Sequence, residues 1–240
     1  MNTHLKNIVD LFTPNKVVDK TIFYGAVIFQ VALFFLFWSQ FHGELLPSPF
    51  QVLHGMGVMI TEENIIPELI ISTMMLLKAM GIAIFVSLFI SYVSTLPFFK
   101  TLGLVTTKFR FFSSIGFTFF FTLITSDGEN LKTSILVFVI ASFFITSMIA
   151  VINGIQTKSY NYAKTLRMGE WESLWYVVIR SKLGDVFEIT RQTIAIGWSL
   201  VAMVEGLSRS AGGLGPILLN QNKQLHLDNV FAIQLMIFII

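Results

Sequence analysis

The 240-residue chain is 54% hydrophobic and only 12% charged, with a mean hydropathy of +0.74, whereas soluble domains carry about 25% charged residues. This composition argues against a soluble globular protein, because a domain of this size has too little interior to hide 25 Phe side chains from water. The net charge of +2 is too small to indicate a nucleic-acid partner, and the absence of cysteine excludes disulfides and thiolate sites. We therefore expect a membrane protein.

The chain begins with a polar segment, residues 1–20, which we expect to be cytoplasmic. The remaining residues, 21–240, are predicted to form a single transmembrane domain. Crossing a hydrocarbon core of about 30 Å takes about 20 apolar residues in a helix. Three segments meet that length, and three further apolar segments are shorter. The long segments are 21–41, 69–96 and 131–152, and the short ones are 111–125, 193–204 and 230–240.

These segments predict an all-α membrane protein, a polytopic bundle of five to six transmembrane helices. The last segment stops at residue 240 after only 11 residues, so we expect an incomplete final helix. With the N-terminus cytoplasmic, eleven of the 16 Lys and Arg residues fall in the cytoplasmic segments 1–20, 97–110 and 153–182, against three on the other side. Since basic residues near helix ends stay in the cytoplasm, this orientation is favoured, and we expect a multi-pass protein of the bacterial cytoplasmic (inner) membrane.

The longest polar stretch runs from residue 153 to about 192. Trp171, Leu174, Trp175 and Val178 follow one another at the i, i+3, i+4, i+7 spacing of an amphipathic helix, which predicts a helix lying along the membrane or under a partner. Further on, Glu188 and Arg191 are three residues apart and are expected to form an ion pair.

The usual enzyme motifs are absent. The four histidines lack metal-ligand spacing, and the chain has no Gly-x-x-x-x-Gly-Lys-Ser/Thr phosphate loop and no Gly-x-Ser-x-Gly motif. We therefore expect no catalytic residues, no metal site and no cofactor, and hence no enzyme. ATP hydrolysis, if the protein uses it, is expected in a partner subunit.

Several segments resemble one family of transporters. Residues 162–166, Trp171 and residues 174–179 resemble the cytoplasmic "EAA" loop of ABC-importer permeases of the binding-protein-dependent type, in the nitrate, sulfonate and taurine branch. Five other segments are similar to that branch in order and spacing, namely 46–53, 198–205, 213–215, 218–220 and 228–232.

The resemblance implies a type I ABC importer permease fold and a permease subunit for a small solute, with an anion such as nitrate, a sulfonate or taurine expected. The implied partners are cytoplasmic ABC ATPase subunits, a periplasmic or extracellular substrate-binding protein and a second permease copy in a homodimer, all within membrane lipid and without nucleic acid. A coupling-helix loop at about 153–182 would contact the ATPase. Its implied coupling residues are Tyr162, Ala163, Leu166, Arg167, Gly169 and Trp171.

The loop departs from the family at one important position. Arg167 stands where the family has a glycine, and Gly169, two residues later, is an alternative source of the bend. This departure keeps open a second function, that of a non-transporting or regulatory subunit derived from a permease. An intramembrane enzyme is a third alternative.

Lys78 and Glu205 are the candidate pathway residues. Lys78 lies well inside an apolar segment, where a charge is usually functional or paired, so the alternatives are an anion pathway, a structural pair or a snorkelling side chain. Glu205 occupies the position of a family glutamate at the outer end of the fifth helix, where substrate gating and a structural hydrogen bond are both open.

Overall fold

The computed structural model describes residues 13–14, 16, 18–40, 46–112, 114–207 and 212–239, and the regular structure of these residues is helical. The chain forms two compact units, residues 1–63 with 221–240 and residues 64–220, which are described separately below. The predicted N-terminal segment 1–20 lies mostly outside the described residues, as does the end of the last predicted helix at residue 240.

The first unit contains α2 (Lys20–Ser39), α3 (Pro49–Thr61) and α12 (Leu227–Ile239). α3 begins at a capping box in which the Ser48 N–H donates to Gln51 Oε1 at 2.7 Å and Ser48 Oγ accepts from the Gln51 N–H. α3 and α12 pack side by side. Gly55 permits this contact, because a Cβ there would lie 3.1 Å from the Asp228 carbonyl oxygen.

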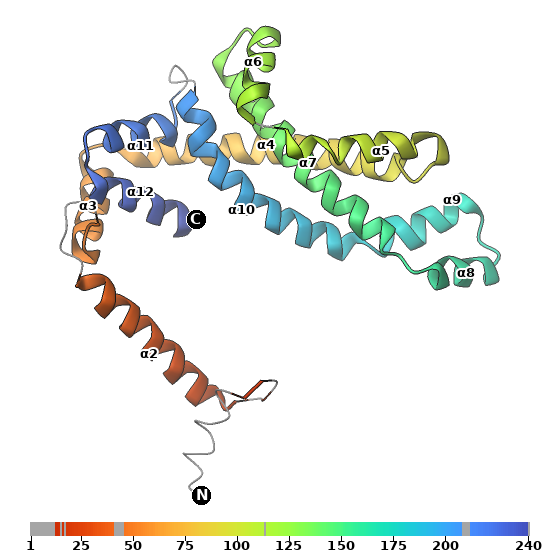
Figure 1. The fold of residues 1–240 in the computed structure, drawn as a ribbon, viewed down its shortest axis with the longest axis horizontal. Helices are drawn as coiled ribbons and strands as arrows, with labels where there is room; N and C mark the ends of the chain where they lie inside the picture. The colour runs from red at the N-terminus through yellow and green to blue at the C-terminus, as the bar shows by residue number, and fades with distance from the viewer. Residues whose placement is uncertain are drawn as a thin grey trace, which may run out of the picture. The chain divides into compact units, whose positions relative to one another are not determined.

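The second unit is built on α4 (Ile65–Val93), α7 (Gly128–Asn153) and α10 (Leu183–Leu207), and α7 crosses α4 obliquely (Figure 1). The helices pack through buried side chains such as Leu76, Leu136 and Val201. Small residues allow their close approach, since a Cβ on Gly197 of α10 would lie 2.6 Å from Leu76 Cδ1.

Short helices join the long ones in this unit. The chain returns from the end of α4 to the start of α7 through a 3₁₀ turn (Pro97–Phe99), α5 (Lys100–Thr106), a second 3₁₀ turn (Phe109–Phe111) and α6 (Ser114–Ile124). Between α7 and α10 come α8 (Thr157–Thr165), α9 (Glu170–Ser173) and the π-helix η3 (Leu174–Arg180). α11 (Leu214–Lys223) follows α10.

Three helices among the described residues are long and apolar enough to cross a membrane: α2, α4 and α7. They confirm the three long segments predicted from the sequence, whose limits differ from the observed ones by at most four residues. α10 is 25 residues long, about twice the predicted segment 193–204, because its polar first half continues the helix. The count of five to six transmembrane helices stays a prediction.

Candidate functional site

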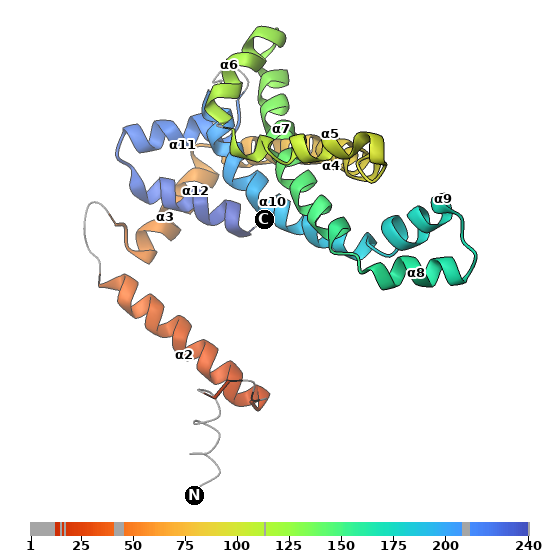
Figure 2. The same ribbon diagram turned by 45° about the vertical axis from the view of Figure 1, so that its right-hand side comes forward.

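The polar stretch between α7 and α10 folds as a helical hairpin. α8 forms one arm, α9 and η3 form the other, and the two arms lie side by side beyond the adjoining ends of α7 and α10 (Figure 2). All six predicted coupling residues lie in this hairpin: Tyr162, Ala163, Leu166, Arg167, Gly169 and Trp171.

The turn of the hairpin is a helix C-terminus of the Schellman type. The Arg167 N–H donates to the Lys164 carbonyl at 3.0 Å, and the Met168 N–H donates to the Ala163 carbonyl at 3.1 Å. In this motif the residue after the helix adopts a left-handed backbone, a position that glycine occupies most often. Arg167 has that conformation, with φ of 57°.

Gly169, the alternative source of the bend, has an extended backbone instead. Its φ is −65° and its ψ is 165°, and its N–H donates to Glu172 Oε2 at 2.9 Å at the start of α9. The left-handed residue of the turn is therefore Arg167 and not Gly169.

The predicted coupling residues separate into two groups by exposure. Ala163 is 2% exposed, so its methyl group belongs to the interior of the hairpin. Tyr162, Leu166 and Trp171 are each more than half exposed. The hairpin thus presents large apolar side chains on its surface, around a turn supported by a small buried residue.

The predicted amphipathic helix is only partly as expected. Val178 is buried and Leu174 half-buried, while Trp171 and Trp175 are exposed. The prediction assumed α-helical periodicity, but residues 174–180 form a π-helix, whose i→i+5 hydrogen bonds turn the side chains differently. The four apolar side chains therefore do not share one buried face.

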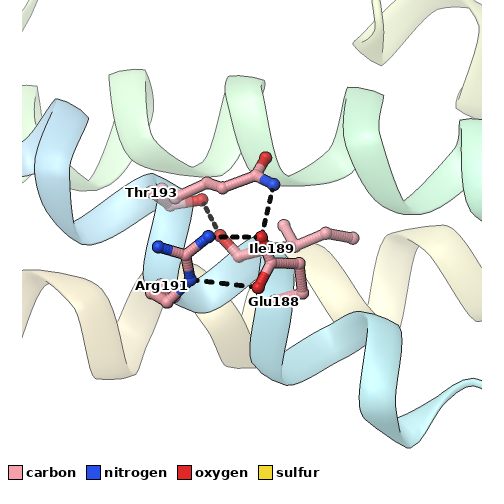
Figure 3. Close-up of polar contacts among 5 residues, drawn as sticks. Glu188, Ile189, Arg191 and Thr193 are labelled. Atoms are coloured by element: carbon pink, nitrogen blue, oxygen red, sulfur yellow. Dashed lines mark hydrogen bonds and ion pairs between the residues drawn. The ribbon is translucent and has the colours of Figure 1, made fainter. Parts of the chain in front are cut away.

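A polar cluster marks the first half of α10. Arg191 donates from Nη2 to Glu188 Oε1 at 2.6 Å and from Nε to Glu188 Oε2 at 3.0 Å, and Gln192 adds a bond to Glu188 Oε1 (Figure 3). This confirms the pair predicted from the i,i+3 spacing. The hydrogen bond from Arg191, with that from Gln192, lowers the pKa of Glu188 to about 2, so the ion pair is present at neutral pH.

A second polar cluster surrounds Glu205, which is 1% exposed. Glu205 Oε1 accepts from the Ser72 hydroxyl at 2.6 Å, and Oε2 accepts from the Gly215 N–H at 2.9 Å. The Leu214 N–H donates to Ser72 Oγ at 3.1 Å. α4 and α10 therefore hold the first residues of α11 through buried hydrogen bonds.

Two charged residues that the sequence did not single out complete this cluster. Glu68 of α4 accepts from the Gly213 N–H, and Lys132 of α7 donates to the Gly212 carbonyl at 2.9 Å. Lys132 is 2% exposed, whereas the sequence only counted it among the three basic residues outside the cytoplasmic segments. Its position near the start of an apolar segment gave no sign of burial, because the partner is a backbone carbonyl eighty residues away.

Lys78 lies beside this cluster. Its Nζ is 3.3 Å from Glu129 Oε1, and the two side chains are 55% and 62% exposed, so the pair remains accessible. Lys78, Glu129, Lys132 and Glu205 line one cavity of about 290 Å³. The two predicted pathway residues, Lys78 and Glu205, are thus brought together, whereas Arg191 pairs with Glu188 elsewhere on α10.

No protein family, no curated protein and no solved structure matches this chain. Within the described part of the chain, no group of three His, Asp or Glu side chains is placed to bind a metal ion.

Proposed function

We propose that this chain is the permease subunit of an ATP-driven ABC importer for a small solute, expected to be an anion. In this proposal the α8–α9–η3 hairpin contacts a cytoplasmic ATPase, and α4, α7 and α10 form part of the translocation pathway. A substrate-binding protein on the outer side and a second permease copy would complete the transporter.

The observation that carries the proposal is the backbone of Arg167. The hairpin segment resembles the EAA loop, and its left-handed residue stands at the position of the family's glycine. A residue other than glycine takes this conformation at a cost of about 1–2 kcal/mol. The turn therefore has a left-handed residue although arginine disfavours that backbone. This supports a loop whose shape is needed for contact with a partner.

The exposed apolar side chains support a docking role for the same hairpin. Tyr162, Leu166 and Trp171 are large, apolar and more than half exposed, and Trp and Tyr are enriched at the energetic centres of protein interfaces. A groove of about 710 Å³ between the arms, lined by Tyr162 and Tyr176, adds further surface. Movement of an ATPase against this rigid hairpin would then be passed to α7 and α10, which adjoin it.

The experiment compares two Leu→Asp variants of the tagged chain, each co-expressed with the cytoplasmic ABC ATPase subunit of the proposed transporter. Leu166→Asp places a charge on the proposed docking surface and is expected to weaken ATPase binding about tenfold or more, the loss typical of an interface hot spot. Leu225→Asp is the matched control, because Leu225 is also exposed and Asp tolerates its left-handed backbone. Co-purified ATPase and permease-stimulated ATP hydrolysis are the measurements.

Equal ATPase binding by Leu166→Asp and wild type would contradict the docking role. Ala163→Asp is not a suitable probe, since Ala163 is buried and its replacement would disrupt the hairpin itself. Solute uptake into vesicles that also contain the ATPase and the binding protein separates an importer from a regulatory subunit derived from a permease, because the latter would bind the ATPase without transport.

The intramembrane enzyme receives less support. Convergence of Lys78, Arg191 and Glu205 on one closed cavity would favour it. Lys78 and Glu205 do line one cavity, but Arg191 lies 14 residues from Glu205 along α10, which is about 21 Å of helix. Ser72 Oγ, the hydroxyl nearest the Glu205 carboxylate, is buried and engaged by two hydrogen bonds.

A further inference from the structure

Lys78 lines two cavities of contrasting character in the second unit. One is the charged cavity of about 290 Å³ that it shares with Glu129, Lys132 and Glu205. The other, of about 510 Å³, lies between α4, α7 and the short helices that join them, and its lining is mostly apolar. Lys78 therefore stands at the junction of a charged cavity and an apolar one.

The apolar cavity is elongated along the helices. On α4 its lining runs from Lys78 to Ile90, 12 residues or about 18 Å of helix. This length is close to the roughly 15 Å that an acyl chain covers in one leaflet, half of a ~30 Å hydrocarbon core. Its volume falls in the 300–1,000 Å³ range of small-molecule sites.

The polar groups of the apolar cavity gather at the end that Lys78 occupies. Asn130 and Ser134 lie there, near the start of α7, and among the described residues neither side chain is hydrogen-bonded to another. The Ser142 and Thr106 hydroxyls, farther along, donate to carbonyl oxygens of their own helices at 2.7 and 2.9 Å. Ile82 and Val86 on the α4 wall are partly exposed, so the cavity is open on this side.

The charged cavity carries two ammonium and two carboxylate groups. Lys132 lies in the wall of this cavity, but it is 2% exposed and donates to the Gly212 carbonyl. Glu205 is occupied by Ser72 and Gly215, whereas Glu129 is exposed and bonded only to Lys78 among these four residues. The accessible charges are thus one cation, Lys78, and one carboxylate, Glu129.

We propose that the two cavities together bind one membrane phospholipid with a zwitterionic headgroup, phosphatidylethanolamine. One acyl chain lies along α4 and α7 in the apolar cavity. The phosphate is bound by the ammonium group of Lys78, and the headgroup ammonium is bound by Glu129. The inference is independent of the proposed transport function, because it requires only that the chain lies in a bilayer.

The test measures lipid binding to the purified full-length chain by native mass spectrometry, with phosphatidylethanolamine and phosphatidylglycerol offered in equal amounts. Wild type is expected to retain phosphatidylethanolamine in preference. Lys78→Met is expected to lower binding of both lipids about tenfold, because that is the effect of losing one hydrogen bond to a charged group. Glu129→Gln is expected to lower phosphatidylethanolamine binding about tenfold and to leave phosphatidylglycerol unchanged, since only the former has an ammonium group.

Two further arms test the apolar cavity. Val137→Phe fills it and is expected to reduce binding of both lipids, while Val31→Phe on the exposed helix α2 is the matched control. If Val137→Phe does not fold, Val86→Phe on the opposite, partly exposed wall makes the same test. Glycerophosphoethanolamine, the headgroup without acyl chains, is expected not to compete with the lipid.

Three results would overturn the proposal. The first is lipid retention that is equal in wild type, Lys78→Met and the cavity-filling variant. The second is competition by glycerophosphoethanolamine as strong as that by the lipid. The third is disulfide cross-linking between two copies of Val137→Cys, since the chain has no other cysteine and the cavity would then be covered by a second copy.

Discussion

Arg167 carries a side chain at a position whose backbone suits glycine. The Schellman hydrogen bonds of the α8 turn fix its φ at 57°, and the methylene at Cβ makes this conformation unfavourable. Arg167→Gly is expected to raise the free energy of unfolding by about 1 kcal/mol, measured as a higher unfolding temperature in detergent.

Lys164→Gly is the control for that change. Lys164 is also exposed and basic, but it lies in the last turn of α8, where glycine costs about 1 kcal/mol relative to a good helix former. The two variants should therefore shift the unfolding temperature in opposite directions. A loss of stability in both would show that the Arg167 side chain makes interactions that outweigh its backbone strain.

Glu205 offers a second test at the residue scale. Glu205→Gln keeps the shape of the side chain, but its amide nitrogen is a donor and would face either the Gly215 N–H or the Ser72 hydroxyl. One buried donor is then left without an acceptor, so we expect a loss of about 1–3 kcal/mol in unfolding free energy. Thermal unfolding in detergent is the measurement. Glu63→Gln changes an exposed carboxylate and should have the same unfolding temperature as wild type. An unchanged unfolding temperature for Glu205→Gln would contradict the role of the buried carboxylate.

Single residues were predictable from the sequence only where the partner is near in the chain. The Glu188–Arg191 pair follows from a spacing of three residues on one helix. The partners of Glu205 and Lys132 are on other helices, and the distances of 133 and 80 residues along the chain leave no local pattern. Arginine itself gives no sign of the left-handed backbone at position 167, which was indicated only by the resemblance of the segment to a loop with glycine there.

Glycines decide how closely the helices of the second unit approach each other. Gly215, in the first turn of α11, lies against the backbone of α10, and a Cβ there would be 2.6 Å from the Gly206 nitrogen and would also meet the Ala202 oxygen. Because backbone atoms cannot rotate away, Gly215→Ala must displace α11. We expect a loss of at least 1–3 kcal/mol in unfolding free energy.

Gly184→Ala, at the start of α10, is the matched control. A Cβ at Gly184 meets no atom within 4 Å, so this substitution should be neutral or stabilise the helix by up to about 1 kcal/mol. Both variants are compared by thermal unfolding in detergent. If Gly215→Ala and Gly184→Ala have the same unfolding temperature, α11 does not pack closely on α10 as described.

The sequence predicted long apolar helices well and polar ones poorly. Hydropathy predicts where α4 and α7 begin and end, because most of their residues are apolar on the buried and the exposed faces alike. It missed the first ten residues of α10, whose Asp185, Glu188 and Arg191 interrupt the apolar run without interrupting the helix. η3 was missed for another reason, since its residues favour a helix but do not reveal its π-type hydrogen bonding.

At the scale of the whole molecule, charge and hydropathy give one consistent topology. α7 is 26 residues long, about 39 Å of helix, which exceeds the ~30 Å hydrocarbon core. A membrane-spanning α7 would place the turn before it and the hairpin after it on opposite sides of the membrane. The five basic residues in segment 153–182 predict that the hairpin lies in the cytoplasm.

This topology predicts the side of each end of α7. Asp127→Cys, in the turn before α7, should react with a membrane-impermeant maleimide added to intact spheroplasts, because Asp127 is exposed and lies on the outer side. Ser159→Cys, exposed on α8, should react only in inverted vesicles or after permeabilisation. Each introduced thiol is the only one in its variant, since the chain has no cysteine. Labelling of both thiols from the same side would exclude α7 as a spanning helix. If instead Ser159→Cys is labelled from outside and Asp127→Cys only from inside, the orientation is reversed. The hairpin would then lie outside the cell, where it could not contact a cytoplasmic ATPase.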